Sequence, residues 1–174
     1  MNWDLILLIT KLVLLLTIIF QDIKDRLVSV WIFPVLLIVV LFQHSSSLLE
    51  LRNHLSVYGL NLLIIAIQFI LVGLTYYLRK KGLNKLFNSI GGGDFLFFII
   101  LIVDFSTLHF ILFYTLALIF SMLLHSLLLI LKPGNDKRIP LAGYMAVLLV
   151  ITTISSSVLR IDPMSNYIME LWIG

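Results

Sequence analysis

The chain has 174 residues, of which 61% are apolar and only 12% are formally charged. A soluble domain carries roughly 45–50% apolar and about 25% charged residues, so this composition excludes a water-soluble globular fold. Cysteine is absent, which excludes disulfides, thiolate metal sites and a cysteine nucleophile.

Apolar runs alternate with short polar segments along the whole chain. A membrane-spanning helix needs about 20 apolar residues, within a range of roughly 17–25. In chain order, the candidate runs are Leu5–Phe20, Val28–Phe42, Leu55–Leu78, Ile90–Leu108, Phe110–Leu131 and Ile139–Val158. The fourth run has the shortest uninterrupted apolar core, Phe95–Val103. Counting it gives six spans, and leaving it out gives five.

The placement of basic residues decides between these counts. Nine of the twelve lysines and arginines lie in three segments, Lys24–Arg26, Arg79–Lys85 and Lys132–Arg138. With six spans, all three segments face one side, as the positive-inside rule requires. With five spans, the third segment would move to the opposite side. We therefore predict an all-α integral membrane protein with about six transmembrane helices, both termini outside and three basic cytoplasmic loops.

No repeat, linker or soluble domain interrupts this pattern, so residues 1–174 are predicted to form a single polytopic membrane domain. The segment 159–174 contains Tyr167 and Trp172 and is expected to lie at the outer interface, where aromatic side chains gather. The basic loops are explained by topology and by contact with anionic lipid, and no nucleic-acid partner is expected. The four histidines are too far apart for a helical metal site.

Acidic residues near the apolar runs are the informative ones, because a charge at mid-bilayer costs at least about 2.5–3.5 kcal/mol. Asp22 and Asp25 close the first helix, and Asp94 opens the fourth directly after three glycines, Gly91–Gly93. The predicted topology brings both acidic sites to the same depth on the cytoplasmic face. We expect Asp25 to be a solvated loop residue.

Other ionisable residues receive simpler interpretations. Asp104 and His109 are expected to be solvated in an outer loop. Lys11 and Asp4 lie seven residues apart on one face of the first helix, and we expect them to pair loosely or Lys11 to reach the interface.

Two apposed carboxylates are suited to aspartyl proteolysis. Like charges about 3 Å apart cannot both ionise, so one carboxyl group stays protonated while the other acts as a base. The base activates a water molecule and the acid polarises the scissile carbonyl. Glycines before Asp94 would let a helix start irregularly and a substrate backbone approach closely. We therefore hypothesise that Asp22, Asp94 and the glycines form the active site of a hydrolase.

The sequence Gly91-x-Gly93-Asp94 matches the GxGD motif of membrane aspartyl proteases, and the chain resembles the type IV prepilin peptidase and preflagellin peptidase family. That family carries D-x-x-x-R-x-I-P-N after its first helix. Here Asp22, Arg26 and the aliphatic Val28 match, whereas Ser29 and Val30 replace Pro and Asn. A segment starting Ile139-Pro140 opens the last helix after a basic loop, as in the family. The resemblance covers nearly the whole chain in order, spacing and topology.

The resemblance implies an aspartic endopeptidase of the cytoplasmic (inner) membrane that cuts the basic leader from prepilin-like or pseudopilin-like precursors at the cytoplasmic face. It implies a catalytic pair, Asp22 and Asp94, with the site shaped by Gly91, Gly92, Gly93 and Arg26. No metal or organic cofactor is implied. The absence of cysteines and of a cytoplasmic insert indicates the short, cleavage-only form without a methyltransferase domain.

A structural interpretation exists for the same residues. Asp22 could be a wetted helix-end carboxylate, and Asp94 could be a helix cap favoured by the helix dipole. These structural roles, together with Ser29 and Val30 in place of the family's Pro and Asn, support an alternative function. In this alternative the chain is a catalytically silent membrane scaffold or assembly partner with the same fold. A small transporter is less favoured, because neither acid lies at mid-bilayer, where transporter sites are found.

Overall fold

The computed structural model describes residues 3–44, 48–78, 91–131 and 140–159, and these residues are helical apart from short connections. The helices are α1 (Trp3–Asp25), α2 (Ile32–His44), α3 (Leu48–Leu78), α5 (Gly92–Asp104), α6 (Thr107–Leu131) and α7 (Leu141–Leu159). Over these residues the all-α prediction is confirmed. The predicted basic segments Arg79–Lys85 and Lys132–Arg138 and the tail 160–174 lie outside the described residues.

The described helices fall into two length classes. Four are long and apolar enough to cross a membrane, within Trp3–Asp25, His54–Leu78, Thr107–Leu128 and Leu141–Leu159. The helices α2 and α5 have 13 residues each, which corresponds to about 20 Å against a hydrocarbon core of about 30 Å. The structure is therefore that of a helical membrane protein, while the count of six spans stays a prediction.

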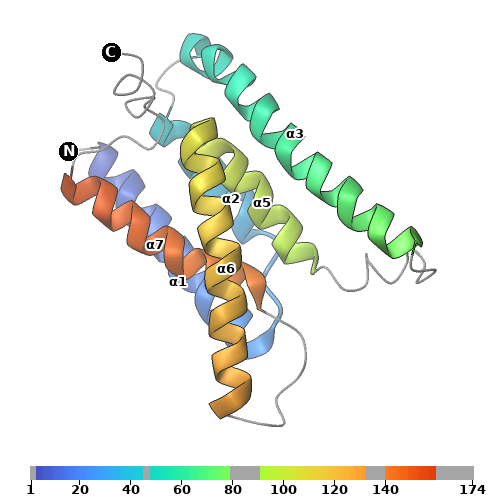
Figure 1. The fold of residues 1–174 in the computed structure, drawn as a ribbon. Helices are drawn as coiled ribbons and strands as arrows, with labels where there is room; N and C mark the ends of the chain where they lie inside the picture. Colours follow the sequence, from blue (N-terminus) through green and yellow to red (C-terminus); the bar gives the residue numbers. More distant parts are fainter. Residues whose placement is uncertain (1–2, 45–47, 79–90, 132–139, 160–174) are drawn as a thin grey trace.

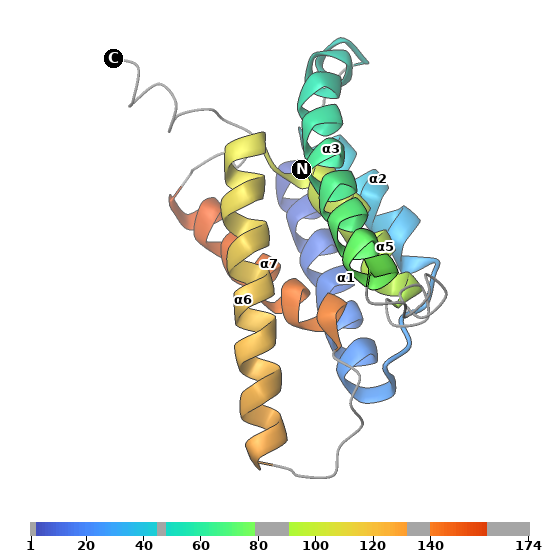
Figure 2. The same ribbon diagram turned by 45° about the vertical axis from the view of Figure 1, so that its right-hand side comes forward.

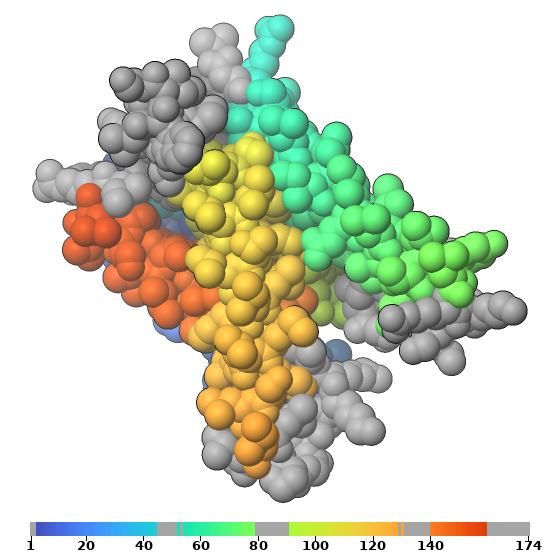
Figure 3. All heavy atoms as spheres, viewed as in Figure 1, coloured from blue at the N-terminus to red at the C-terminus, as the bar shows by residue number. Residues whose placement is uncertain are grey.

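Helix α5 lies at the centre of the bundle. It packs against α2, α3, α6 and α7, while α1 runs beside α7 and α2 (Figures 1 and 2). In the space-filling view α6 crosses the front of the molecule and α3 forms one edge (Figure 3). The fully buried apolar side chains come from most of these helices and include Leu15, Ile18, Leu36, Phe97, Leu101, Phe110 and Leu149.

Large apolar side chains also cover much of the outside. Ile70 on α3 is 67% exposed, and Met122 on α6 is 65% exposed. A soluble monomer rarely shows apolar surface over whole helices, whereas a helix that is apolar all round is typical of a membrane span. The outer faces of α3 and α6 are therefore suited to contact with lipid.

Reporter fusions would test the predicted topology. A reporter fused after Lys81 or Lys137 should read cytoplasmic, and one fused within residues 43–54 or at Gly174 should read external, because most basic residues flank the former positions. In the structure, the end of α1 and the starts of α5 and α7 meet at one face, as this topology requires. Paired alkaline phosphatase and fluorescent protein fusions measure the result, and a cytoplasmic C-terminus would contradict the six-span arrangement.

Candidate active site

The first turn of α7 presents backbone donors to two acidic side chains. The first hydrogen bond within α7 runs from the Tyr144 amide to the Pro140 carbonyl, at 3.1 Å. The amides before Tyr144 therefore have no acceptor inside the helix. The Ala142 amide instead donates to Asp94 Oδ1 at 2.9 Å, and the Gly143 amide donates to Asp22 Oδ2 at 2.5 Å.

These two hydrogen bonds bring Asp22 and Asp94 together. The donating nitrogens are consecutive in the chain and only three covalent bonds apart, so the two accepting oxygens lie no more than about 10 Å from each other. The charge of Asp22 acts on the Asp94 carboxyl group. The structure thus places side by side the two acids selected from the sequence, and their catalytic role stays a prediction.

Asp94 is positioned by the start of its own helix. It is the third residue of α5, and its Oδ2 accepts a hydrogen bond from the Gly91 amide at 3.2 Å. One carboxylate oxygen therefore caps α5 while the other caps α7, an arrangement related to the capping box. The half-buried side chain is held from two directions.

The three glycines expected to shape the site differ in what surrounds them. Gly91 has φ −66° and ψ 139°, which any residue adopts, but a Cβ there would lie 3.1 Å from Asp94 Oδ2. A Cβ on Gly92 would meet nothing within 4 Å, and one on Gly93 would be 3.7 Å from the Phe33 ring. Of the three, Gly91 is the one whose lack of a side chain makes room for the acid.

Asp22 is positioned by the end of α1. Its side chain is buried, with 7% exposure. The helix ends where Arg26 takes a φ of 54°, a left-handed conformation common after a helix C-terminus, and the Arg26 amide donates to the Asp22 carbonyl at 3.1 Å. The charge of Arg26 acts on Asp22 and on Tyr144. Asp25 is exposed, as predicted, but it is the last residue of α1 and not part of a loop.

Gly143 is a site residue that the sequence reasoning missed. A Cβ there would lie 3.0 Å from Asp22 Oδ2 and 3.1 Å from Asp22 Cβ, so the close approach of the carboxylate depends on glycine. The sequence carries a signal for this role, because Ile139-Pro140 marks the start of a helix just before Gly143. A helix N-terminus has free amides and a positive dipole end that attract carboxylates.

Replacing Gly143 with alanine should therefore disturb the site. The added methyl group must displace the Asp22 side chain, and such overpacking typically lowers the free energy of unfolding by about 1–3 kcal/mol. Gly92→Ala is the matched control, because its methyl group enters open space and should change stability little. Thermal unfolding in detergent measures both. Equal melting temperatures for Gly143→Ala and Gly92→Ala would contradict the close contact.

Positive charges lie around the two acids. The N-terminal end of α7 carries a partial positive charge, which is attractive to nearby carboxylates, and the Arg26 guanidinium adds a full positive charge beside Asp22. Two carboxyl groups held in this way could share a proton and activate a water molecule. The arrangement could equally serve to cap α7.

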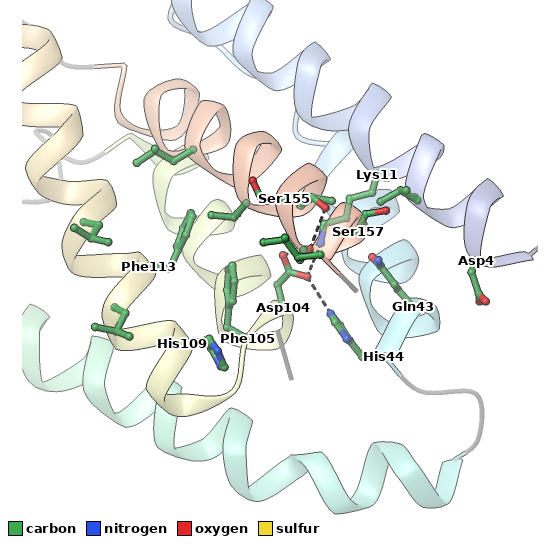
Figure 4. Close-up of a pocket in the computed structure, with 18 of the residues that line it drawn as sticks. Asp4, Lys11, Gln43, His44, Asp104, Phe105, His109, Phe113, Ser155 and Ser157 are labelled. Atoms are coloured by element: carbon green, nitrogen blue, oxygen red, sulfur yellow. Dashed lines mark hydrogen bonds and ion pairs between the residues drawn. The ribbon is translucent and has the colours of Figure 1, made fainter. Parts of the chain in front are cut away.

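The structure corrects the expectations for Asp104 and Lys11. Asp104 was predicted to be solvated in an outer loop, but it is the last residue of α5 and is 1% exposed. Lys11 was expected to pair with Asp4 or reach the interface, but it is 2% exposed, and its Nζ lies 2.6 and 2.8 Å from the Asp104 carboxylate oxygens. His44 Nε2 lies 3.1 Å from Asp104 Oδ1 (Figure 4).

The cause of these errors is the length of α5. With 13 residues, α5 ends inside the bundle beside the first half of α1. A buried carboxylate needs a partner, and Lys11 supplies the opposite charge. His109 was also predicted to be solvated, but it is half-buried, and its Nδ1 lies 2.8 Å from the Ser106 hydroxyl.

Comparison of the chain with models of protein families, with curated proteins and with solved structures finds no match. Function is therefore inferred from the residues and from the geometry at the start of α7.

Proposed function

We propose that the chain is a membrane aspartyl endopeptidase, similar to the prepilin and preflagellin peptidases, with Asp22 and Asp94 as its catalytic pair. One observation carries the proposal. Two acids from α1 and α5 converge on consecutive amides of α7. These are the acids that occupy the two aspartate positions of the motifs quoted above.

In the proposed reaction, one carboxyl group is protonated and the other is ionised. The ionised group takes a proton from a water molecule that attacks the scissile carbonyl, and the protonated group polarises the carbonyl oxygen. Collapse of the tetrahedral intermediate transfers a proton to the leaving amine. The amides of Ala142 and Gly143 orient the two carboxyl groups, and Arg26 lies beside Asp22.

The proposed substrate is a prepilin-like or pseudopilin-like precursor with a short basic leader before a hydrophobic helix. Exposed apolar side chains on the segment after α1 and beside Asp94 in the chain support this choice. Leu27 and Trp31, which follow α1, are 78% and 82% exposed, and Phe95, next to Asp94, is 52% exposed. They offer an apolar surface for the substrate helix. We place the protein in the cytoplasmic membrane with six spans, both termini outside and the site at the cytoplasmic face.

A silent scaffold is the second candidate, and a specific observation favours it. Both carboxylates already accept hydrogen bonds from helix N-termini, and Asp94 caps two helices. Capping alone would account for acidic residues at these positions. Ser29 and Val30, in place of the Pro and Asn of the family pattern, also fit a protein that keeps the fold without the activity.

A cleavage assay separates the two candidates. The wild-type chain, purified in detergent, is incubated with a precursor that carries a basic leader and a hydrophobic helix, and the products are identified by mass spectrometry. We expect one cut at the boundary between leader and helix. A precursor whose basic leader residues are replaced by serine is the control and should be cut poorly. If folded wild-type protein cleaved no precursor, the scaffold would be the function that remains.

A further inference from the structure

A cavity of about 1260 Å³ lies at the opposite end of α5 from Asp94 (Figure 4). Asp104 lines it, and Asp94 lies about 15 Å away along the helix. The cavity is therefore separate from the candidate active site. Its wall residues come from α1, α2, α3, α6 and α7 and from the connection between α5 and α6.

The cavity exists because two central helices are short. The helices α2 and α5 end at His44 and Asp104, which contact each other at the cavity wall. The part of α1 from Lys11 back to Trp3 extends about 12 Å past this level. The longer neighbours therefore border a space beyond the ends of the short helices, and this space is partly open to the outside.

Buried charges form one side of this space. Lys11 and Asp104 are 2% and 1% exposed, and the His44 side chain is 6% exposed. Ionisable residues inside a membrane protein are rare, and they mark functional sites. Within the described residues no group of three or more acidic or imidazole side chains is arranged to hold a metal ion.

The remaining walls divide into an apolar and a polar part. Helix α6 contributes Leu112, Phe113 and Leu116, whereas the last turns of α7 contribute hydroxyl side chains at Thr152, Thr153, Ser155, Ser156 and Ser157. A ligand that contacts both parts must be amphiphilic. The volume exceeds the roughly 300–1,000 Å³ of drug-sized pockets, which favours a molecule with a long hydrocarbon chain.

The charges select the headgroup. Among the described lining residues one is basic, Lys11, and two are acidic, Asp4 and Asp104. Lys11 and Asp104 neutralise each other, which leaves the exposed carboxylate of Asp4 in excess when the histidines are neutral. This balance disfavours an anionic lipid and favours a headgroup that carries an ammonium. The Thr152 and Ser156 hydroxyls donate to carbonyls of their own helix, whereas the Ser155 and Ser157 hydroxyls of the same wall can donate to a phosphate.

We propose that the cavity binds phosphatidylethanolamine, with an acyl chain along α6 and the zwitterionic headgroup among the polar side chains of α7, α2 and α1. The site does not depend on the proposed peptidase function. It would tie a specific membrane lipid to the bundle at the end opposite the two acids.

Native mass spectrometry of the purified protein, titrated with phosphatidylethanolamine or phosphatidylglycerol of equal chain length, tests the proposal. The wild type should retain phosphatidylethanolamine and little phosphatidylglycerol. Leu116→Trp fills the apolar wall and should lose the retained lipid. Leu123→Trp is its control, because Leu123 is on the same helix, 65% exposed and outside the cavity wall. Leu116 is 62% exposed, so folding should survive. Leu112→Trp gives a second test at the same wall.

The headgroup is tested separately. Asp4→Asn should reduce the preference for phosphatidylethanolamine over phosphatidylglycerol, whereas Asp25→Asn, an exposed acid at the other end of α1, should leave it unchanged. If the wild type retained both lipids equally, the retained lipid would be bound only nonspecifically at the protein surface, and the proposal would be overturned. Retention by Leu116→Trp equal to that of Leu123→Trp would overturn it too.

Discussion

Asp22→Asn and Asp94→Asn should each reduce cleavage of a prepilin-like precursor to background. General acid–base catalysis contributes about 10²–10⁴-fold to a rate, and asparagine removes the titrating proton while keeping an oxygen that can accept from the Gly143 or Ala142 amide. Residues that act as a unit are not additive. The double variant should therefore be little worse than either single variant.

Asp25→Asn provides the matched control for these variants. Asp25 lies on the same turn as Asp22 but is exposed, so its replacement should keep most of the activity. A processing gel, run beside the membrane level of each variant, measures the result. Equal processing by wild type and Asp94→Asn at equal expression would leave the scaffold as the remaining function.

Lys11→Met should destabilise the fold strongly. The side chain of Lys11 contacts both carboxylate oxygens of Asp104, and both residues are almost fully buried. Removing one partner of a buried pair costs about 3–5 kcal/mol, because the other charge is left uncompensated. Unfolding in increasing concentrations of SDS, followed by circular dichroism, measures this loss.

A double variant distinguishes a lost ion pair from lost packing. Lys11→Met combined with Asp104→Leu removes both charges and keeps apolar volume, and such replacements are often neutral or stabilising. We expect it to recover most of the stability lost in Lys11→Met. If the double variant were as unstable as Lys11→Met alone, the buried pair would not be the cause. Lys24→Met, at an exposed position of α1, is the control for the substitution itself.

Asp94 and Asp104 lie at the two ends of one short helix, α5. At one end, Asp94 accepts from the first turn of α7. At the other end, Asp104 is held by Lys11 of α1 and by His44 of α2. Helix α5 is thus joined to neighbouring helices by polar contacts at both ends.

The sequence by itself determined that these segments are helical, but not every helix end, since α3 begins at Leu48 and α5 ends at Asp104. A chain in a bilayer must satisfy its backbone groups internally, so long apolar runs predict helices without any knowledge of their neighbours. Asp22 and Asp25 do end α1, and Asp94 does lie in the first turn of α5. The positions of both acids followed from hydropathy and from the short motifs around them.

The tertiary structure decided which side chains meet. Lys11 pairs with Asp104, 93 positions away, and not with Asp4 on its own helix. Asn61 of α3, which no motif marks, donates to the Ile102 and Phe105 carbonyls at the end of α5 at 3.0 and 2.9 Å. Hydropathy carries no information on how deep a short helix ends or which neighbour reaches its free carbonyls and amides. The closeness of Gly143 to Asp22 has the same origin, since it depends on how α7 packs against α1.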